Sequence, residues 1–382
     1  MEVDKKYCMS SFLMYRAIVD ENKCFSKDYI PSHFKINFPR VPISNSLDLE
    51  LTIRRFVEEW TSDGKAALAL SGGIDSAIIA RFMPTGSKVY TFQCIVPGKE
   101  VTNEVPQALK YVKECGLKHE VIPIYWKDME KYAPLLMKNK GAPIHSIEVQ
   151  IYKAALKAKE DGYNKLIFGE TSDINYGGLD KFFFNEWTIG DWLERYCYIM
   201  PYVALKDFEV INDPIKKYQK NGIVNVHEFL RNFTLKTSMG SYINACKCAG
   251  IEFKSPYLMT YMSEPLDYKR IQKGESKYLV REVFKKLYPN IEVPIKISMP
   301  RPMTEWFNGW NGPIRDEFWP HCINNFNGDQ KWLVWALEKF LNICDKIEWD
   351  INLNYSKKAN EDFKFWYIFL LYRIYAEKIY LS

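Results

Sequence analysis

The chain has 382 residues, which is enough for one large core or two ordinary ones, because domains typically contain about 100 to 200 residues. Hydrophobic residues make up 47% and charged residues 26%, a composition that is typical of folded globular proteins and excludes disorder on a large scale. The formal net charge of +5 includes no long basic run, so nucleic-acid binding is not indicated.

Cysteine usage and the two ends of the sequence predict a cytoplasmic protein without a membrane partner. The nine cysteines are odd in number and irregularly spaced, so they do not indicate a disulfide framework. The first residues, Met1 to Lys6, lack the apolar stretch of a secretion signal. Phe365 to Tyr372 is the most apolar segment near the C-terminus. Because a membrane-spanning helix needs about 20 apolar residues, we expect a buried terminal helix there.

The order of the predicted elements indicates an α/β fold. Residues 1–46 carry no decisive pattern, and residues 47–60 predict a helix that leads into the first strand. Four strands are then predicted at 66–70, 89–95, 119–124 and 165–169, and the helices between them at 75–83, 103–115, 127–139 and 147–161. This alternation predicts right-handed crossovers and a parallel, doubly wound sheet with helices on both faces. Beyond residue 175 the sequence is rich in aromatic residues and helical patterns, which predicts a mostly helical C-terminal lobe.

The loop at 71–76, with the sequence Ser-Gly-Gly-Ile-Asp-Ser, follows the first predicted strand directly. Ligands of open parallel sheets bind beyond the carboxyl ends of the strands. Gly72 and Gly73 let the backbone approach a phosphate, and the N–H groups at the start of the next helix complement its charge. Ser71 and Ser76 add hydroxyl donors, and Asp75 offers a carboxylate to Mg²⁺. A tight turn with a capping aspartate is the alternative, but the apolar strand and helix on either side favour a phosphate site.

The spacing within this loop excludes two common nucleotide motifs. No Gly-Lys-Ser/Thr follows, as in a Walker loop, and the Gly-x-Gly-x-x-Gly spacing of dinucleotide-binding folds is missing. Ser-Gly-Gly-x-Asp-Ser after a strand instead resembles the PP-loop of the N-type ATP pyrophosphatases. That resemblance implies an adenine nucleotide alpha hydrolase-like sheet and cleavage of ATP between its α and β phosphates. It also implies a substrate that is activated as its adenylate before a nucleophile displaces AMP.

Three further segments carry a more specific resemblance. Residues 169–178, Gly-Glu-Thr-Ser-Asp-Ile-Asn-Tyr-Gly-Gly, are similar to the Gly-Glu-Gly-Ser-Asp-Glu-Leu-Phe-Gly-Gly segment of asparagine synthetases, with departures at Thr171 and Ile174. Residues 249–258 and 277–296 are similar to two later segments of that family, in the same order. The chain is therefore identified as a member of the asparagine synthetase family over residues 47–310. Residues 1–46 form an N-terminal extension and residues 311–382 a helical C-terminal part of the same domain.

The resemblance implies ATP and Mg²⁺ as cofactors and gives roles to individual residues. Asp75 and Asp173 would hold Mg²⁺ on the triphosphate, and Lys296 would stabilise the charge that builds up during the reaction. Glu170 would accept a proton from the attacking nitrogen. The family's backbone contacts to ATP fall on Leu70, Cys94 and Gly169.

The resemblance also predicts the class of reaction. In β-lactam synthetases, which close a ring within one molecule, a tyrosine stands at the position of Glu170, so a glutamate there indicates a reaction between two molecules. Glutamine-dependent asparagine synthetases carry an N-terminal glutaminase whose cysteine follows the initiator methionine, whereas this chain has Glu2 and no room for that domain before the sheet. We therefore expect an amide ligase for a small carboxylic acid, with nitrogen from ammonia, an amine or a separate glutaminase. The sequence is also compatible with a homo-oligomer.

Two other functions are compatible with the loop. A nucleotide- or base-modifying enzyme would adenylate a carbonyl oxygen, and a sulfur-transferring version would need a cysteine pair, for which Cys94 and Cys115 are the candidates. A catalytically silent ATP-binding homologue is the other alternative, although the loop residues, Asp173 and Lys296 are all present. The Cys246–Cys248 pair lacks a second pair of ligands, so we expect it to serve helix packing rather than a metal. His119, His145 and His227 have no ligand spacing, and we expect structural roles for them.

Overall fold

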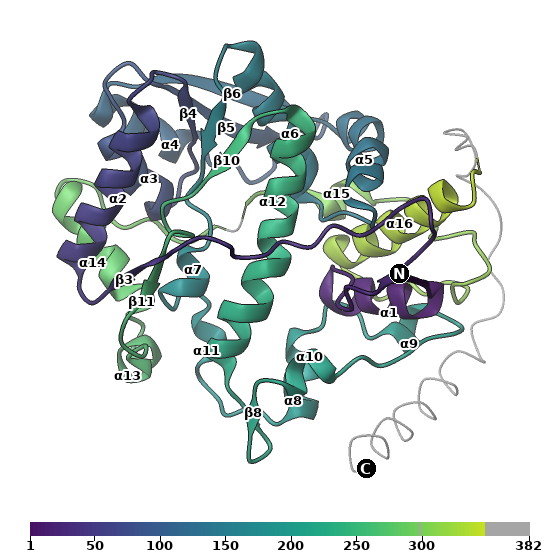
Figure 1. Ribbon diagram of the computed structural model, residues 1–382. Coiled ribbons are helices and arrows are strands. Elements are labelled where there is room, and N and C mark those ends of the chain that lie inside the picture. Colours follow the sequence, from purple (N-terminus) through teal and green to yellow (C-terminus); the bar gives the residue numbers. More distant parts are fainter. Residues whose placement is uncertain (298, 348–382) are drawn as a thin grey trace.

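A parallel sheet of five strands forms the centre of the computed structural model, which describes residues 1–297 and 299–347 (Figure 1). The strand order is β10-β7-β4-β5-β6. The strands are β4 (Ala66–Ala69), β5 (Lys88–Cys94), β6 (Lys118–Ile124), β7 (Lys165–Ile167) and β10 (Glu252–Lys254). Every residue of β4 is buried, because this central strand has helices on both of its faces. The predicted α/β class with a parallel sheet is confirmed.

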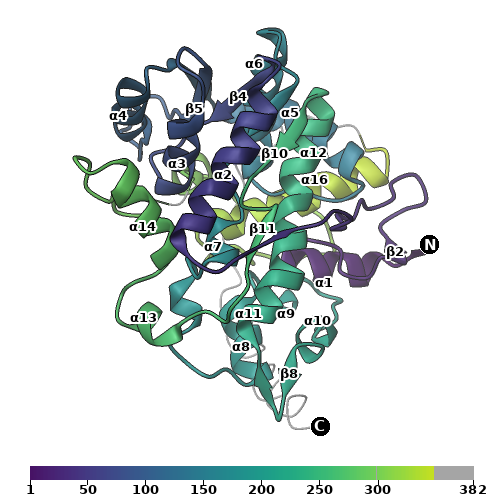
Figure 2. The same ribbon diagram turned by 60° about the vertical axis from the view of Figure 1, so that its left-hand side comes forward.

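Two layers of helices cover the sheet (Figures 1 and 2). One layer contains α2 (Ser46–Thr61), α3 (Ile74–Phe82), α4 (Val105–Cys115) and α14 (Tyr278–Leu287), and the other contains α5 (Trp126–Lys140), α6 (Ile147–Glu160) and α12 (Leu235–Ala249). The helices are amphipathic: in α4, Ala108 and Tyr111 face the core while the lysines lie outside. All the strands and helices predicted up to residue 169 are present, with bounds that differ by at most two residues.

The order of the strands creates a switch point between β4 and β7. From β4 the chain continues to β5 and β6 on one side and then returns to β7 on the other side. β4 and β7 are direct neighbours, with Ala66 opposite Lys165 and Leu68 opposite Ile167. The loops that follow these two strands therefore leave the sheet side by side and diverge over opposite faces, which is where open α/β sheets bind their ligands.

Two parts of the fold have no clear signal in the sequence: β10 and the elements within residues 1–46. β10 has only three residues and a partly exposed face, so no apolar run or alternation marks it. The first residues form β1 (Glu2–Val3), α1 (Lys5–Tyr15), β2 (Lys23–Cys24) and β3 (Val41–Ile43). β3 pairs with β11 (Thr260–Met262), and α1 packs on α16 (Gly328–Cys344) (Figure 1). The N-terminal extension thus packs against the C-terminal lobe.

Helices predominate over strands in the second half of the described chain, as predicted, although irregular segments connect many short elements. Its shorter elements are α7 (Ser172–Asn175), a 3₁₀ turn (Asp180–Phe182), α8 (Ile189–Tyr196), α9 (Pro201–Ala204), α10 (Asp213–Lys216), the hairpin β8 (Gln219–Lys220) and β9 (Ile223–Val224), α11 (Val226–Phe229), a π-helical turn (Leu230–Thr234), α13 (Tyr268–Gln272) and α15 (Met303–Trp306). The predicted terminal helix at Phe365–Tyr372 lies outside the described residues. Within the described ranges, no helix is both long enough and apolar enough to span a bilayer.

A buried ion pair joins the helices on one face of the sheet. Lys140 at the end of α5 donates to Glu148 Oε1 at 2.6 Å, and Asn244 of α12 donates to Glu148 Oε2 at 2.8 Å. The backbone N–H of His145 donates to the same carboxylate at 2.9 Å. Glu148 has no exposed surface, so its charge depends entirely on these partners.

We expect Glu148→Ala to lower the free energy of unfolding by about 3 to 5 kcal/mol, because it leaves the ammonium of Lys140 buried without a counter-charge. Denaturant unfolding measures the change. Glu275→Ala is a matched control, because Glu275 pairs with Arg270 at 2.7 Å on the surface, and its loss should cost about 1 kcal/mol or less. Equal losses for the two variants would contradict a structural role for the buried pair.

Candidate active site

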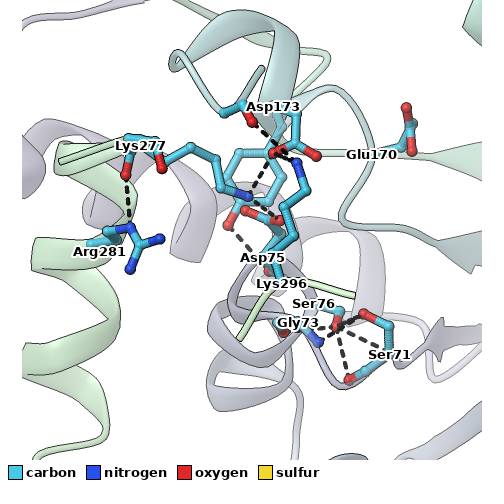
Figure 3. Close-up of polar contacts among 12 residues, drawn as sticks. Ser71, Gly73, Asp75, Ser76, Glu170, Asp173, Lys277, Arg281 and Lys296 are labelled. Atoms are coloured by element: carbon cyan, nitrogen blue, oxygen red, sulfur yellow. Dashed lines mark hydrogen bonds and ion pairs between the residues drawn. The ribbon is translucent and has the colours of Figure 1, made fainter. Parts of the chain in front are cut away.

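The predicted phosphate loop joins β4 to α3 and is held by its own side chains (Figure 3). Ser71 Oγ lies 2.9 Å from Ser76 Oγ and accepts the N–H of Gly73 at 3.1 Å. The N–H of Ser71 donates to Ser76 Oγ at 3.1 Å. The loop is therefore fixed before any ligand binds, with the start of α3 directed toward the carboxyl edge of the sheet.

Gly169 lets the end of β7 pack against this loop. A Cβ at Gly169 would lie 2.8 Å from the backbone nitrogen of Ser76 and 3.0 Å from the Cβ of Asp75. These distances leave no room for a side chain, so packing alone requires a glycine at this position, whether or not a ligand is bound. Its predicted backbone contact with ATP stays a prediction.

Gly72 is packed against α4. A Cβ at Gly72 would lie 3.2 Å from the Cβ of Gln107, and the hydroxyl of Tyr111 donates to the Gly72 carbonyl at 3.3 Å. Beside them, burial raises the pKa of Glu104 to about 7, although its hydrogen bond with the Gly72 backbone opposes this. The carboxyl group of Glu104 therefore holds its proton to a higher pH than an ordinary glutamate does. No local sequence pattern marks it, because the contact joins distant segments.

Two aspartates and two lysines meet above the loop (Figure 3). Lys277 Nζ lies 2.6 Å from Asp75 Oδ2 and 3.0 Å from Asp173 Oδ1. Lys296 Nζ lies 2.9 Å from Asp173 Oδ1 and donates to the carbonyl of Gly178 at 3.1 Å. The structure thus brings together Asp75, Asp173 and Lys296, as the sequence analysis predicted. Lys277 is the first residue of the segment 277–296, which is similar to the family, but nothing in the sequence indicated that it bridges the two aspartates.

The lysines keep the carboxylate of Asp173 ionised. Burial by itself raises the pKa of Asp173, but the ammonium groups of Lys277 and Lys296 outweigh it and lower this pKa to about 2. Burial likewise lowers the pKa of Lys277, and the two carboxylates reverse that effect and raise it above its ordinary value. Asp173 and Lys277 are therefore both charged at neutral pH.

The donor set fits a magnesium ion that is shared with phosphates. Within residues 1–297 and 299–347, Asp75 Oδ1 is buried and has no hydrogen-bond partner, and Asp173 Oδ1 contacts lysine ammonium groups. Carboxylate oxygens are the ligands that Mg²⁺ prefers, and it commonly binds one or two of them together with substrate phosphates and water. In the described residues no group of three metal-binding side chains is present, so protein ligands alone would not complete such a site.

Glu170 lies to one side of this cluster and lines a separate cavity (Figure 3). The cavity has a volume of about 550 Å³ and also borders Asp173. Burial raises the pKa of Glu170, while hydrogen bonds from the hydroxyls of Tyr242 and Ser238 oppose this rise. Ser238 Oγ donates to Glu170 Oε1 at 3.2 Å. A carboxylate with a raised pKa beside an open space is suited to accept a proton from a bound molecule.

The segment at 249–258 supports both halves of the site. Ser255, just after β10, donates to the carbonyl of Glu170 at 2.8 Å. Tyr257 donates to the carbonyl of Asp75 at 3.1 Å. These hydroxyls fix the backbone from which the two carboxylates project, so β10 contributes to the position of the site although it carries none of the charged groups.

The asparagine synthase family model matches residues 49–316 of the chain. This chain belongs to the asparagine synthase family. All of the charged residues of the site lie within the matched range.

Comparison with solved structures gives weaker likenesses. An NH3-dependent NAD synthetase from Campylobacter jejuni is 15% identical, with a TM-score of 0.24, and the match covers 35% of this chain and 60% of that one. An NMN synthetase from Francisella tularensis is 13% identical, with a TM-score of 0.26, covering 67% of this chain and 100% of that one. No curated protein matches the chain. The family assignment therefore rests on the family model.

The remaining predicted contacts with ATP lie at the ends of β4 and β5. The N–H of Leu70 donates to the carbonyl of Tyr90, and its own carbonyl accepts the hydroxyl of Thr91, both at 2.8 Å. Cys94 is buried, and its thiol donates to the carbonyl of Pro300 at 3.3 Å. Both residues reach the carboxyl edge of the sheet, but their contact with ATP stays a prediction.

Thr171 stands where the similar asparagine synthetase segment has a glycine. Its φ angle is 74°, in the left-handed region that a β-branched residue seldom adopts. The side chain is buried, and its hydroxyl has no hydrogen-bond partner among the residues that the structure describes. The backbone between Glu170 and Asp173 therefore requires this conformation, and threonine adopts it at a cost of about 1 to 3 kcal/mol.

We expect Thr171→Gly to raise the free energy of unfolding by about 1 kcal/mol, because glycine adopts this φ without strain and removes an unpaired hydroxyl. Denaturant unfolding measures it. Thr171→Val keeps the β-branched shape, and so the strain, and should gain less. A glycine variant that is no more stable than the wild type would show that the strain is absent.

Proposed function

We propose that this protein is an ATP-dependent amide ligase. In the proposed reaction it adenylates the carboxylate of a small acid and transfers the acyl group to ammonia or an amine, with release of AMP and pyrophosphate. The main support is the position of two different sets of groups on adjacent strand ends. The loop after β4 and the aspartate–lysine cluster suit a triphosphate, and Glu170 beside them faces a cavity large enough for a second substrate.

In the first step, a carboxylate oxygen of the acid attacks the α-phosphorus of ATP. The bond to the bridging oxygen breaks, and pyrophosphate leaves. The N–H groups of the loop and the ammonium groups of Lys277 and Lys296 would hold the phosphates and balance their charge. Mg²⁺ held by Asp75 and Asp173 would neutralise charge on the departing pyrophosphate.

In the second step, nitrogen attacks the acyl carbon, and AMP leaves. The nitrogen loses a proton as the new bond forms, and Glu170 is placed to accept it. Lys296 is half-exposed beside Asp173 and would stabilise negative charge on the reacting carbonyl oxygen. The source of the nitrogen is ammonia, an amine or a separate glutaminase.

The rival functions have less support. A sulfur-transferring enzyme would need two cysteines together, but Cys94 is at the carboxyl end of β5, whereas Cys115 ends α4 at the opposite edge of the sheet and contacts Tyr288. Burial also raises the pKa of the Cys94 thiol to about 12, so it is protonated at neutral pH. A silent homologue gains no support from a site whose charged groups are all present and in contact.

The first step is tested by exchange of labelled pyrophosphate into ATP, with Mg²⁺ and a panel of small carboxylic acids. We expect Asp173→Asn to slow this exchange by about 100-fold or more, because a charge that orders both lysines is lost. Asp63→Asn is the matched control, since Asp63 pairs with Lys165 at the amino end of β7. Exchange at the wild-type rate in Asp173→Asn would refute the assignment.

The second step is tested with Glu170→Gln. We expect pyrophosphate exchange to persist, while amide formation from the same acid falls by about 100-fold or more. Because burial raises the pKa of Glu170, the wild-type amide rate should fall with decreasing pH at a higher pH than an ordinary carboxylate would give. Ser238→Ala removes a hydrogen bond that favours the charged form, so it should move this fall to still higher pH. An unchanged amide rate in Glu170→Gln would exclude Glu170 as the base.

A further inference from the structure

The cavity beside Glu170 is completed by residues that precede the family match. Its wall includes Tyr15 and Arg16 from the end of α1, together with residues of α6, α8, α12 and α16. The family model begins only at residue 49. The N-terminal extension therefore supplies part of the space into which Glu170 faces.

Arg16 is held in place by a rigid turn. It caps α1 in the left-handed conformation, with φ at 57°, and its N–H donates to the carbonyl of Phe12 at 2.7 Å. Ser11 fixes the residues that follow, donating to the carbonyl of Ala17 at 2.7 Å and accepting the N–H of Val19 at 2.9 Å. The guanidinium group lies over the ring of Tyr198, 3.8 Å from its centroid. Such a turn fixes the backbone from which the side chain enters the cavity wall.

The guanidinium donates to the two polar side chains beside it. Its two terminal nitrogens contact the Tyr198 hydroxyl and His145 Nε2. Because arginine has donors only, His145 Nε2 accepts this contact and has no proton to offer a bound molecule. Burial, with Arg16 as a further cause, lowers the pKa of His145 and keeps it neutral. The Tyr198 oxygen accepts from Arg16, which leaves its own proton free to donate.

The acidic groups on the cavity wall already have partners. Asp173 is paired with Lys277 and Lys296, and Asp329 is paired with Arg301 at 3.2 Å. Glu170 accepts from Ser238 and Tyr242. Among the described residues, no carboxylate forms an ion pair with Arg16. In the described part of the chain, the guanidinium charge of Arg16 therefore lies on the cavity wall without a paired carboxylate, beside the Tyr198 hydroxyl.

We propose that Arg16 and the Tyr198 hydroxyl bind an anionic group that the substrate in this cavity carries besides its reacting group. A carboxylate or a phosphate has the acceptor oxygens for both donors, and the guanidinium fork suits either. This inference rests on the proposed function, because it assigns the cavity to the molecule that meets Glu170. It makes Arg16 a specificity-determining residue supplied by the N-terminal extension.

Calorimetric titration of the full-length protein tests this proposal without the natural substrate. The probes are succinate for the carboxylate and methyl phosphate for the phosphate, with Mg²⁺ and α,β-methylene-ATP present so that the phosphate loop is filled. We expect at least one probe to bind the wild type and Arg16→Gln to weaken that probe about tenfold or more. The probe that binds identifies the anionic group.

Arg55→Gln is the charge-matched control, since Arg55 is exposed on α2 and lies over Phe56. Its probe affinity should equal that of the wild type. Tyr198→Phe removes one donor but keeps the ring under the guanidinium, so it should weaken the probe about threefold to tenfold and serves if Arg16→Gln does not fold.

Failure of both probes to bind the wild type, or wild-type probe affinity in both Arg16→Gln and Tyr198→Phe, would overturn the inference. Failure of the proposed function is distinguishable, because it would appear as no pyrophosphate exchange with any acid in the wild type. Failure of this inference alone would leave exchange intact and independent of Arg16.

Discussion

The site depends on one ammonium group placed between two carboxylates. Asp75 lies in the first turn of α3 and Asp173 in the first turn of α7, and these helices follow adjacent strands. Without a cation between them, two half-buried carboxylates would repel each other and favour protonation of one. Lys277, in the left-handed conformation at the start of α14, supplies that cation and ties α14 to the sheet edge. The packing of α14 on α2 and α3 is therefore linked to the charge state of the site.

The backbone around this cluster leaves little freedom for its groups to move. Gly169 places β7 against the start of α3, and Gly178 lies so close to Asp173 that a Cβ would be 2.0 Å from its Oδ1. Hydroxyls from Ser255 and Tyr257 fix the carbonyls of Glu170 and Asp75. Groups that are held in this way need little reorganisation when charge develops, which is the main source of electrostatic catalysis.

The cavity wall draws on segments beyond the family match. The phosphate loop, the aspartates and both lysines lie within the segment that the asparagine synthase family model matches. Most of the cavity wall belongs to the same segment, but Arg16, before it, and Asp329 and Trp332 of α16, after it, complete the wall. The N-terminal extension and α16 therefore shape the cavity that Glu170 faces, while the aspartate–lysine cluster lies wholly within the matched segment.

The sequence by itself determined the elements whose signal is local. Apolar runs marked β4 and β7, and two glycines with serine and aspartate marked the loop after β4, because burial and close phosphate approach select residue types at neighbouring positions. Ordered matches then identified Asp173, Glu170 and Lys296. Only the tertiary structure decided what depends on contacts between distant segments: β10 as an edge strand, Lys277 between the aspartates, and Arg16 beside Glu170's cavity. A single sequence carries no record of such pairs, since each partner alone is an ordinary lysine, arginine or short polar strand.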